Sequence, residues 1–222
     1  MEHELNLSRH VELFDPRTFE MPITVIGAGA TGSWLVLSLA RLGLTNITVY
    51  DFDIIEEHNV PNQAFGLADV GRPKVDALKE LVYNTTGIEI TAINERFTNQ
   101  RVAGVVYMMV DSMTARKEIW KNSIKMKTAV QLLIEPRMGL DGGRVYNVNP
   151  MDMTHIKKYE DTYYGDDVAE VSACGASMTV ISSALGVTSW CIRQLINFHN
   201  GEELDNEILI DFKYNNIITT RW

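Results

Sequence analysis

Short apolar runs alternate with amphipathic stretches along most of the chain. Residues 23–27 form an apolar run with the length of a buried parallel strand, residues 32–43 carry apolar side chains at helical spacing, and residues 46–53 form a second apolar run. Together these stretches predict a β-α-β unit. The same alternation predicts further strands and helices at 73–86, 88–94, 105–111, 112–124 and 128–135. We therefore expect a Rossmann-like, doubly wound α/β fold with a mostly parallel sheet.

The pattern changes after residue 135. Residues 142–150 predict a strand that leaves the parallel order, residues 175–198 a buried helix, and residues 206–222 a hairpin that closes at its Asn-Asn pair. Residues 150–172 are polar, acidic and rich in tyrosine, and they show no clear period. Because a long loop in a compact domain is usually functional or mobile, we expect a mobile loop there. The C-terminal part is thus expected to extend the sheet in antiparallel fashion.

Length and composition bound the domain organisation and the possible partners. At 222 residues and 45% hydrophobic, the chain can bury one core, so we expect one domain over 22–222 after an N-terminal helical segment at 1–21. The net charge of −9 comes without any block of lysine or arginine, which disfavours a nucleic-acid groove. The chain has neither a long apolar run nor a signal-like start, and it has no CxxC pair. A cytoplasmic protein without a membrane span or a structural zinc site is expected.

A glycine-rich turn joins the first predicted strand to the first predicted helix. Gly27, Gly29 and Gly32 allow a tight turn and close approach of the backbone to a phosphate, and Thr31 lies inside the turn. The helix that follows presents free N–H groups to an anion. The pattern indicates a nucleotide site but does not distinguish ATP from NAD, and a tight turn without a ligand is the alternative.

Charged residues follow the later elements. Asp51 ends the second strand, where an acid accepts hydrogen bonds from a ribose diol, and Asp53 is the second candidate for this role. Lys74 begins a helix, a position at which a cation is unfavourable unless it faces an anion such as polyphosphate. Asp111 ends an apolar strand, where it is a candidate Mg²⁺ ligand or the cap of the next helix. For Asp51 and Lys74 the alternatives are a turn cap and a solvated surface charge.

Five stretches in this order resemble the ThiF/MoeB/HesA family, bacterial relatives of ubiquitin-activating enzymes: GAGATG, YDFD, HNVPNQ, DVGRPKVDAL and the aspartate before SMTAR. The resemblance covers most of residues 5–130 and continues weakly beyond them. It implies the cofactors ATP and Mg²⁺ and the adenylation of a carboxylate, typically the C-terminus of a ubiquitin-like or sulfur-carrier protein, with release of pyrophosphate. It also implies a homodimer.

The resemblance implies roles for individual residues. By position, Asp51 holds the ribose, Lys74 the phosphates and Asp111 the Mg²⁺. The triphosphate neighbourhood is then completed by Asn59 and Gln63. The stretch LSRHVEL resembles the family's N-terminal segment, which implies that Arg9 reaches into the site of a partner subunit, with an exposed surface arginine as the alternative. Such cations stabilise the charge that develops when a carboxylate attacks the α-phosphorus.

Two departures separate this chain from the family pattern. Asn62 stands where a phosphate-binding arginine is expected, so one positive charge is missing unless Arg72 or Arg9 replaces it. The zinc-binding CxxC pairs are absent as well, which indicates a divergent branch. Cys174 precedes a predicted helix, whose N-terminus lowers a thiol pKa, so it is a candidate for a covalent acyl intermediate, with a small buried residue as the alternative.

Three functions remain open at this point. Adenylation of a carboxylate is the leading hypothesis, because a lysine and a second aspartate downstream suit a triphosphate and its metal rather than a nicotinamide. An NAD-dependent oxidoreductase and a non-catalytic nucleotide-binding scaffold are the alternatives, the second because of Asn62. The acceptor is also open. A ubiquitin-like or sulfur-carrier C-terminus is the leading candidate, and a peptide terminus and a modified tRNA base are the alternatives.

Overall fold

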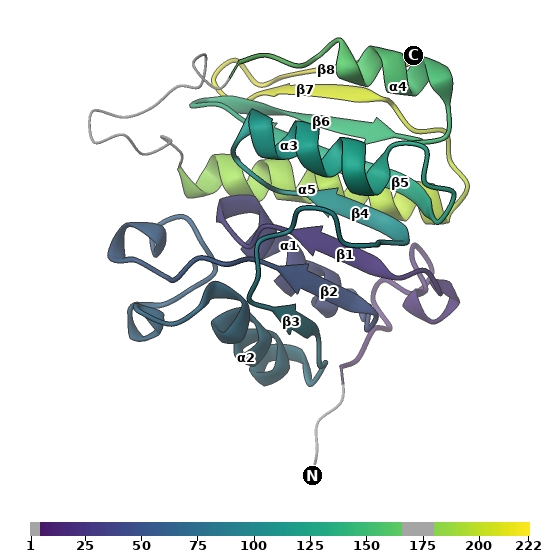
Figure 1. Ribbon diagram of the computed structural model, residues 1–222. Helices are drawn as coiled ribbons and strands as arrows, with labels where there is room; N and C mark the ends of the chain where they lie inside the picture. The colour runs from purple at the N-terminus through teal and green to yellow at the C-terminus, as the bar shows by residue number, and fades with distance from the viewer. Residues whose placement is uncertain (1–4, 166–179) are drawn as a thin grey trace.

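The computed structural model describes residues 5–165 and 180–222, through which an eight-stranded sheet runs in the order β3-β2-β1-β4-β5-β6-β7-β8 (Figure 1). The parallel strands are β1 (Ile23–Ile26), β2 (Ile47–Tyr50), β3 (Thr91–Ile93), β4 (Gly104–Met108) and β5 (Val130–Met138). The strands that follow pair in antiparallel fashion and are β6 (Gly142–Val148), β7 (Glu207–Asp211) and β8 (Asn216–Thr220).

Helices cover both faces of this sheet. On one face, α1 (Ala30–Arg41) packs between α2 (Lys74–Thr86) and α5 (Ile181–His199). The other face carries α3 (Met113–Ile119), a π-helical continuation η4 (Trp120–Ile124) and α4 (Met153–Glu160). Figure 1 shows α3 and α5 on opposite sides of the central strands. Each face therefore has its own apolar cluster, as a doubly wound fold requires.

The central strands explain where a ligand can bind. Every residue of β1 and of β4 is buried, because helices cover both faces of these strands. Chain connections leave β1 toward β2 on one side and reach β4 on the other, so the strand order reverses at β1. In open α/β sheets the crevice outside the carboxyl ends of the strands at such a reversal is the usual ligand site. The short helices η2 (Glu57–Asn59) and η3 (Leu67–Asp69) follow β2 at this same edge (Figure 1).

The main predictions for the fold are confirmed. The β-α-β unit, the parallel order up to β5 and the antiparallel extension after it are all present. The C-terminal hairpin is also present, with a turn of four residues, 212–215, between β7 and β8. Its last turn residue, Asn215, has a φ of 55°, which asparagine tolerates better than most residues. The Asn-Asn pair therefore ends the turn and begins β8.

The prediction of a loop over 150–172 is wrong for its first part. Residues Met153–Glu160 form α4, whose N-cap Asp152 accepts hydrogen bonds from the backbone N–H groups of Thr154 and His155. Only Ile156 and Tyr159 of α4 are buried, and two apolar positions in eight residues are too few to show a period. Residues 166–172 lie outside the described ranges.

The N-terminal segment forms turns rather than the expected helix in its described part. Backbone bonds from His10 to Leu7 and from Phe14 to His10 close consecutive turns, and a short 3-10 helix, η1 (Pro16–Thr18), follows. Pro16 cannot donate a backbone hydrogen bond, so a continuous helix does not pass through it. Phe14 packs against His199 with ring centroids 5.3 Å apart, which fastens the segment to the end of α5.

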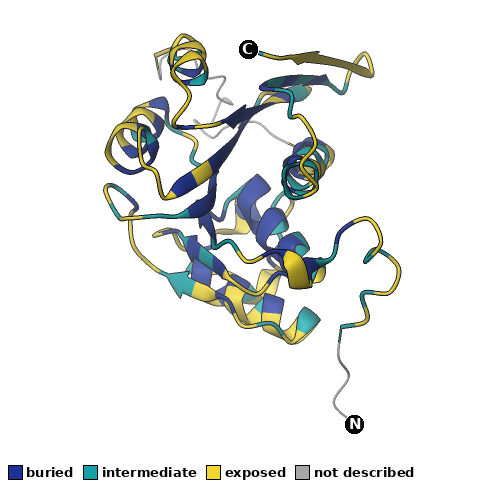
Figure 2. Cartoon of the chain, turned by 90° about the vertical axis from the view of Figure 1, so that its right-hand side faces the viewer, coloured by how far each residue is buried: buried dark blue, intermediate teal, exposed yellow. Residues whose placement is uncertain are grey.

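The C-terminal edge of the sheet is open to solvent. All five residues of β8 are exposed, and Figure 2 shows this strand in yellow beside the C-terminus.

Among the described residues, no helix combines the length and apolar character that crossing a membrane requires.

Candidate functional site

The glycine turn has the shape of a phosphate cradle. Gly27 has a φ of 102°, and a Cβ there would lie 2.7 Å from the carbonyl oxygen of Met109. A Cβ on Gly32 would lie 2.0 Å from the carbonyl oxygen of Gly27, so both positions require glycine. A Cβ on Gly29 would meet nothing within 4 Å. The turn is thus closed against β4 and open at Gly29, where an anion can approach the backbone.

The first turn of α1 faces this opening. Gly29 is the N-cap of the helix and supplies no side-chain hydrogen bond, so the first backbone N–H groups are left for an anion. The side chain of Thr31 is buried, and its carbonyl accepts a hydrogen bond from the hydroxyl of Thr188 at 3.3 Å. Thr31 therefore ties the start of α1 to α5 and keeps the helix terminus in place.

Asp51 joins the turns after β1 and β2. Its Oδ2 accepts from the backbone N–H of Ala28 at 2.6 Å, and its Oδ1 accepts from the backbone N–H of Asp53 at 2.8 Å. Burial raises the pKa of Asp51 above its ordinary value, against the two backbone hydrogen bonds and the charge of Lys74, which lower it. Each carboxylate oxygen retains a free lone pair, so hydroxyl donors such as those of a ribose can still bind.

Lys74 lies beside the same turn in an ion pair with Asp53. Its Nζ is 2.9 Å from Asp53 Oδ2, and its backbone N–H donates to the carbonyl of Asp53 at 3.0 Å. The lysine side chain is 8% exposed, whereas the Asp53 side chain is 48% exposed. The cation is therefore nearly buried and is paired with one half-exposed carboxylate, and its charge also opposes the rise that burial causes in the pKa of Asp51.

The loop between η2 and η3 packs on the start of α1. The backbone carbonyl of Asn62 accepts from Trp34 Nε1 at 3.0 Å, and the N–H of Ala64 donates to Ser33 Oγ at 3.0 Å. Asn59 Oδ1 accepts from the backbone N–H of Glu56 and so caps η2. Beside them, Gln63 Oε1 is buried and has no hydrogen-bond partner among the described residues. Asn59, Asn62 and Gln63 therefore lie near the glycine turn, with Asn59 Oδ1 already occupied.

Asp111 follows β4 at the same edge of the sheet. Its side chain is exposed and forms no hydrogen bond or ion pair within the described parts of the chain. The alternative of a helix cap is wrong for Asp111, because Ser112 caps α3 by accepting from the N–H of Ala115 at 3.3 Å. In the described ranges no three His, Cys, Asp or Glu side chains form a metal cage. A single carboxylate suits Mg²⁺, which takes one or two carboxylates and completes its shell with phosphate oxygens.

Two other candidates, Arg9 and Arg72, form no hydrogen bond or ion pair with the glycine turn among the described residues. Arg9 is exposed on the N-terminal segment, whose neighbouring Leu7 contacts the far end of α1 at Gly43. Arg72 is paired with two carboxylates, those of Asp69 and Glu80, and so is not a free replacement for the missing arginine. Cys174 lies outside the described residues. The other cysteine, Cys191, is buried in α5, and burial raises the pKa of its thiol.

A buried charge cluster near this edge was missed by the sequence analysis. Glu135 in β5 is fully buried and accepts hydrogen bonds from Arg116, from Arg137 Nε and Nη2 at 2.8 and 3.0 Å, and from the hydroxyl of Tyr159. The pKa of Glu135 is lowered, because the two arginines outweigh the effect of burial, which raises it. The available signal was a glutamate inside an otherwise apolar strand pattern.

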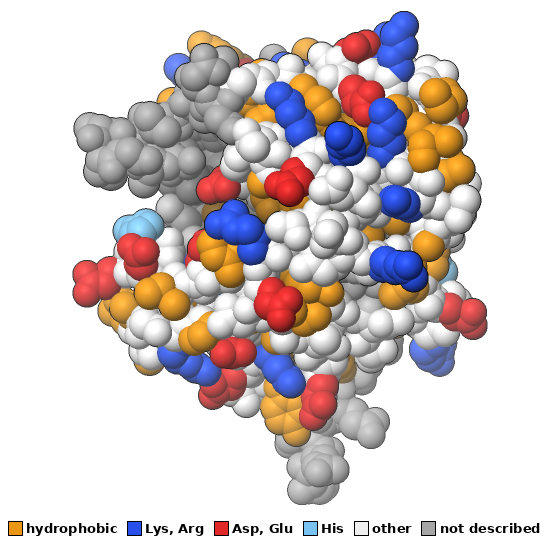
Figure 3. Space-filling view, in the orientation of Figure 1, with side chains coloured by type: hydrophobic (Ala, Val, Ile, Leu, Met, Phe, Trp, Pro, Cys, Tyr) orange, Lys and Arg blue, Asp and Glu red, His pale blue; other side chains and the backbone are white. Residues whose placement is uncertain are grey.

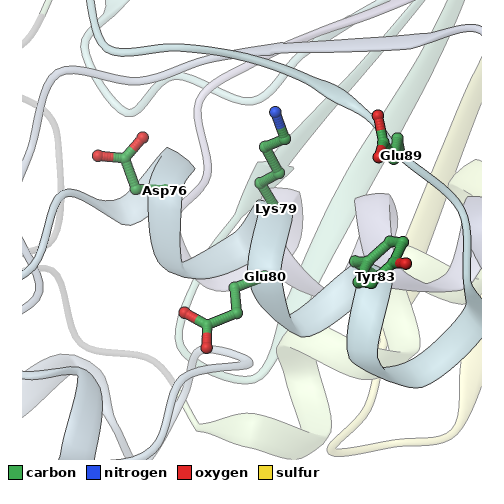
Figure 4. A pocket seen from close by; sticks show the side chains of 5 residues that line it. All are labelled: Asp76, Lys79, Glu80, Tyr83 and Glu89. Carbon is green, nitrogen blue, oxygen red and sulfur yellow. The ribbon is translucent and has the colours of Figure 1, made fainter.

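Two hollows lie elsewhere on the surface. One, of about 340 Å³, is lined by side chains on successive turns of α2 and by Glu89 before β3 (Figure 4). The other, of about 860 Å³, lies among the β5–β6 turn, the end of α4 and the β7–β8 turn. On the face seen in Figure 3 the acidic and basic side chains are interspersed. Neither hollow is lined by the glycine turn. The candidate site is therefore defined by the residues that follow the carboxyl ends of β1, β2 and β4.

The fold is shared with solved structures. The structure of E. coli MccB with ATP matches this chain with a TM-score of 0.69 at 16% identity, over 99% of this chain and 72% of that chain. At this low identity the likeness shows the fold alone.

Relatives in sequence match part of the chain. The NEDD8-activating enzyme E1 catalytic subunit of Arabidopsis thaliana is 34% identical over 131 residues, which are 51% of this chain and 29% of that protein. The tRNA threonylcarbamoyladenosine dehydratase 2 of Saccharomyces cerevisiae is 37% identical over 101 residues, covering 43% of this chain and 23% of that protein. The matched region thus spans less than a third of either relative. The ThiF family, in contrast, matches residues 5–209, and this chain therefore belongs to the ThiF family.

Proposed function

We propose that this protein uses Mg·ATP to adenylate a carboxylate, most simply the C-terminus of a ubiquitin-like, sulfur-carrier or other peptide acceptor, and releases pyrophosphate. The observation that carries this proposal is the nearly buried Lys74, paired with a single half-exposed carboxylate beside an open glycine turn. Membership of the ThiF family and similarity to a NEDD8-activating enzyme support it.

The chemistry needs positive charge more than it needs a base. A carboxylate is already ionised at neutral pH, and its attack on the α-phosphorus brings two anions together. We assign the ribose to Asp51 and the phosphates to the N–H groups of α1 and to Lys74. The lysine would leave Asp53 for the phosphates, because Asp53 is half-exposed and water can solvate the carboxylate that is released. Mg²⁺ on Asp111 would neutralise charge on the phosphate oxygens and on the departing pyrophosphate.

The remaining positive charge is proposed to come from a second subunit. Arg9 is exposed and lies toward the far end of α1 from its own glycine turn, so only a neighbouring subunit's turn is within its reach. This requires a homodimer in which the N-terminal segments cross. Asn62 and Gln63 would line the triphosphate from the loop that packs on α1, with Asn62 supplying an amide where the family has a charge. The two cysteines of the chain fit a reducing cytoplasm.

Two rival functions make different predictions. An NAD-dependent oxidoreductase requires nicotinamide binding, for which the same glycine turn is suited. A non-catalytic scaffold would bind nucleotide weakly and would keep its biological activity after Lys74→Ala. The pairing of Lys74 favours a triphosphate over a dinucleotide as the ligand, because a dinucleotide offers no terminal phosphate to draw the lysine from Asp53.

The test is calorimetric titration of the purified protein with ATP and Mg²⁺, with ATP and EDTA, and with NAD. We expect Mg·ATP to bind and NAD not to bind. Asp111→Ala should lose the Mg²⁺-dependent part of the affinity, whereas Asp161→Ala, an exposed aspartate after α4, should bind as the wild type does. Binding of NAD in place of ATP would overturn the proposal, and binding of neither would favour the scaffold.

A further inference from the structure

Arg116 fills the space where β4 leaves the sheet. The pairing of β4 with β5 ends at Tyr107 and Ile134, while β5 itself continues to Met138. Beyond that point β5 still pairs with β6, but carbonyls that face the β4 side need another partner, since buried carbonyls are rarely left unpaired. The guanidinium of Arg116 donates to the carbonyl of Pro136 at 3.1 Å and to the carbonyl of Val110. One side chain thus joins the exit of β4 to the continuing strand.

Glu135 fixes the guanidinium in this position. Its carboxylate lies beside Arg116 Nη1 and is also bound by Arg137 and by the hydroxyl of Tyr159. Tyr159 belongs to α4, so the carboxylate is anchored to a helix as well as to its own strand. A fully buried carboxylate is costly unless its hydrogen-bonding capacity is filled, as it is here. The cluster therefore gives Arg116 one orientation.

The contacts of Arg116 bracket Asp111. Its side chain holds the carbonyl of Val110, the residue before Asp111, while its backbone N–H makes the ordinary first-turn bond of α3, at 3.0 Å, to the carbonyl of Ser112, the residue after Asp111. The carboxylate of Asp111 has no contact of its own within the described residues that would orient it. The direction in which it points is consequently set by the backbone on either side: the start of α3 holds the Ser112 side, and the side chain of Arg116 holds the Val110 side.

We propose that Arg116, locked by Glu135, is a positioning residue that fixes the direction of the Asp111 carboxylate toward Mg²⁺. The role toward Mg²⁺ rests on the proposed function. The effect of Arg116 on the backbone of residues 109–112, the turn between β4 and α3, does not depend on that function. Lysine cannot replace this arginine, because a single ammonium does not present the planar fork that reaches two carbonyls and a carboxylate together. Arg137 binds the same carboxylate and the carbonyl of Thr162 instead, so it has no contact with the turn.

Arg116→Lys and Arg137→Lys form a matched pair for the test. Both keep a positive charge beside Glu135, but only Arg116→Lys releases the carbonyls of Val110 and Pro136. Hydrogen exchange measured by mass spectrometry should be about tenfold faster for residues 109–112 in Arg116→Lys and close to wild type in Arg137→Lys. The Mg²⁺ concentration for half-maximal ATP binding should rise about tenfold in Arg116→Lys, as loss of an outer-shell contact does at metal sites.

The outcomes separate the two proposals. Wild-type exchange and wild-type Mg²⁺ requirement in Arg116→Lys, or equal changes in both variants, would overturn the positioning role. If the wild type binds no Mg·ATP, the proposed function fails, and exchange alone then decides whether Arg116 holds the turn. Should Arg116→Lys not fold, Tyr159→Phe removes one hydrogen bond from Glu135 and no charge, and it should accelerate exchange at 109–112 to a smaller extent. Unchanged exchange in that variant would count against the inference.

Discussion

Two carboxylate-cation groups lie along the same edge of the sheet, and they are built in opposite ways. After β2, Lys74 is balanced by Asp53, whose side chain is 48% exposed. Within β5, Glu135 is fully buried and is bound by two arginines and a tyrosine. The first group holds a cation that, as we propose, an incoming anion takes over, whereas in the second the carboxylate already accepts four hydrogen bonds and is fully buried. Similar residue types are therefore half-exposed in one place, where we propose binding, and buried in the other, where they join strand and helix.

The energetic reason for this difference is desolvation. An ion pair with a solvent-exposed partner contributes about 0–1 kcal/mol, so a phosphate can displace Asp53 from Lys74 at little cost. A buried charge that loses its partner cannot be rescued by water, and breaking such a pair costs about 3–5 kcal/mol. The substitutions below test this comparison.

Glu135→Gln should have the largest effect on stability. It leaves the guanidinium groups of Arg116 and Arg137 buried without a counter-charge, and we expect the free energy of unfolding to fall by about 3–5 kcal/mol in urea titrations. Asp53→Asn removes a carboxylate of the same kind from an exposed pair and should change it by less than about 1 kcal/mol. Equal losses of unfolding free energy in the two variants would show that burial does not separate the two ion pairs.

The stability of the wild type and of Glu135→Gln can also be compared across pH. The pKa of Glu135 is lowered in the folded state, so its contribution is fully present above the unfolded value of about 4.3 and is lost as pH falls through the folded value. The stability difference between wild type and Glu135→Gln should accordingly be constant near neutral pH and shrink only below about pH 4. A difference that disappears already at about pH 6 would show that another group is responsible.

Lys74→Ala should reduce ATP affinity by about two orders of magnitude, because a hydrogen bond to a charged group contributes about 1.5–3 kcal/mol. Asp53→Asn serves as its partner control, because it frees the lysine without removing it. We expect that variant to bind ATP at least as well as the wild type in calorimetry. If Asp53→Asn loses as much affinity as Lys74→Ala, the ion pair itself would be part of the binding site, and the proposed exchange of partners would be wrong.

Asn62→Arg should give the smallest effect, an increase in ATP affinity of about tenfold, equivalent to about 1.5 kcal/mol, the low end for one added hydrogen bond to a charged group. The contact of Asn62 with Trp34 uses the backbone carbonyl, so the substitution leaves that packing intact. Asn62→Gln, which adds length without charge, should match the wild type in the same titration. No gain from arginine would mean that Asn62 does not face the phosphates.

The carboxyl edge of the sheet was readable from the sequence, because its determinants are local. The apolar period defines β1, α1 and β2, and the glycine spacing defines the turn between them, since both depend on residues only a few positions apart. The helix α4 was not predicted because its local pattern is weak: its eight residues bury only Ile156 and Tyr159. A helix that short is selected by the sheet it covers and by its cap rather than by its own pattern.

Local patterns also could not reveal which charges meet. Lys74 lies 21 positions after Asp53 and Glu135 lies 19 positions after Arg116, separations that carry no signal along the chain. Parallel strands bring their ends to one edge through helical crossovers, so distant residues become neighbours only when the sheet is assembled. Burial then decides what each charge can do, because it sets the cost of losing a partner. The sequence by itself determined the family, the glycine turn and the candidate residues, and only the tertiary structure decided that Lys74 is paired with a half-exposed carboxylate and that Arg116 is paired with a buried one.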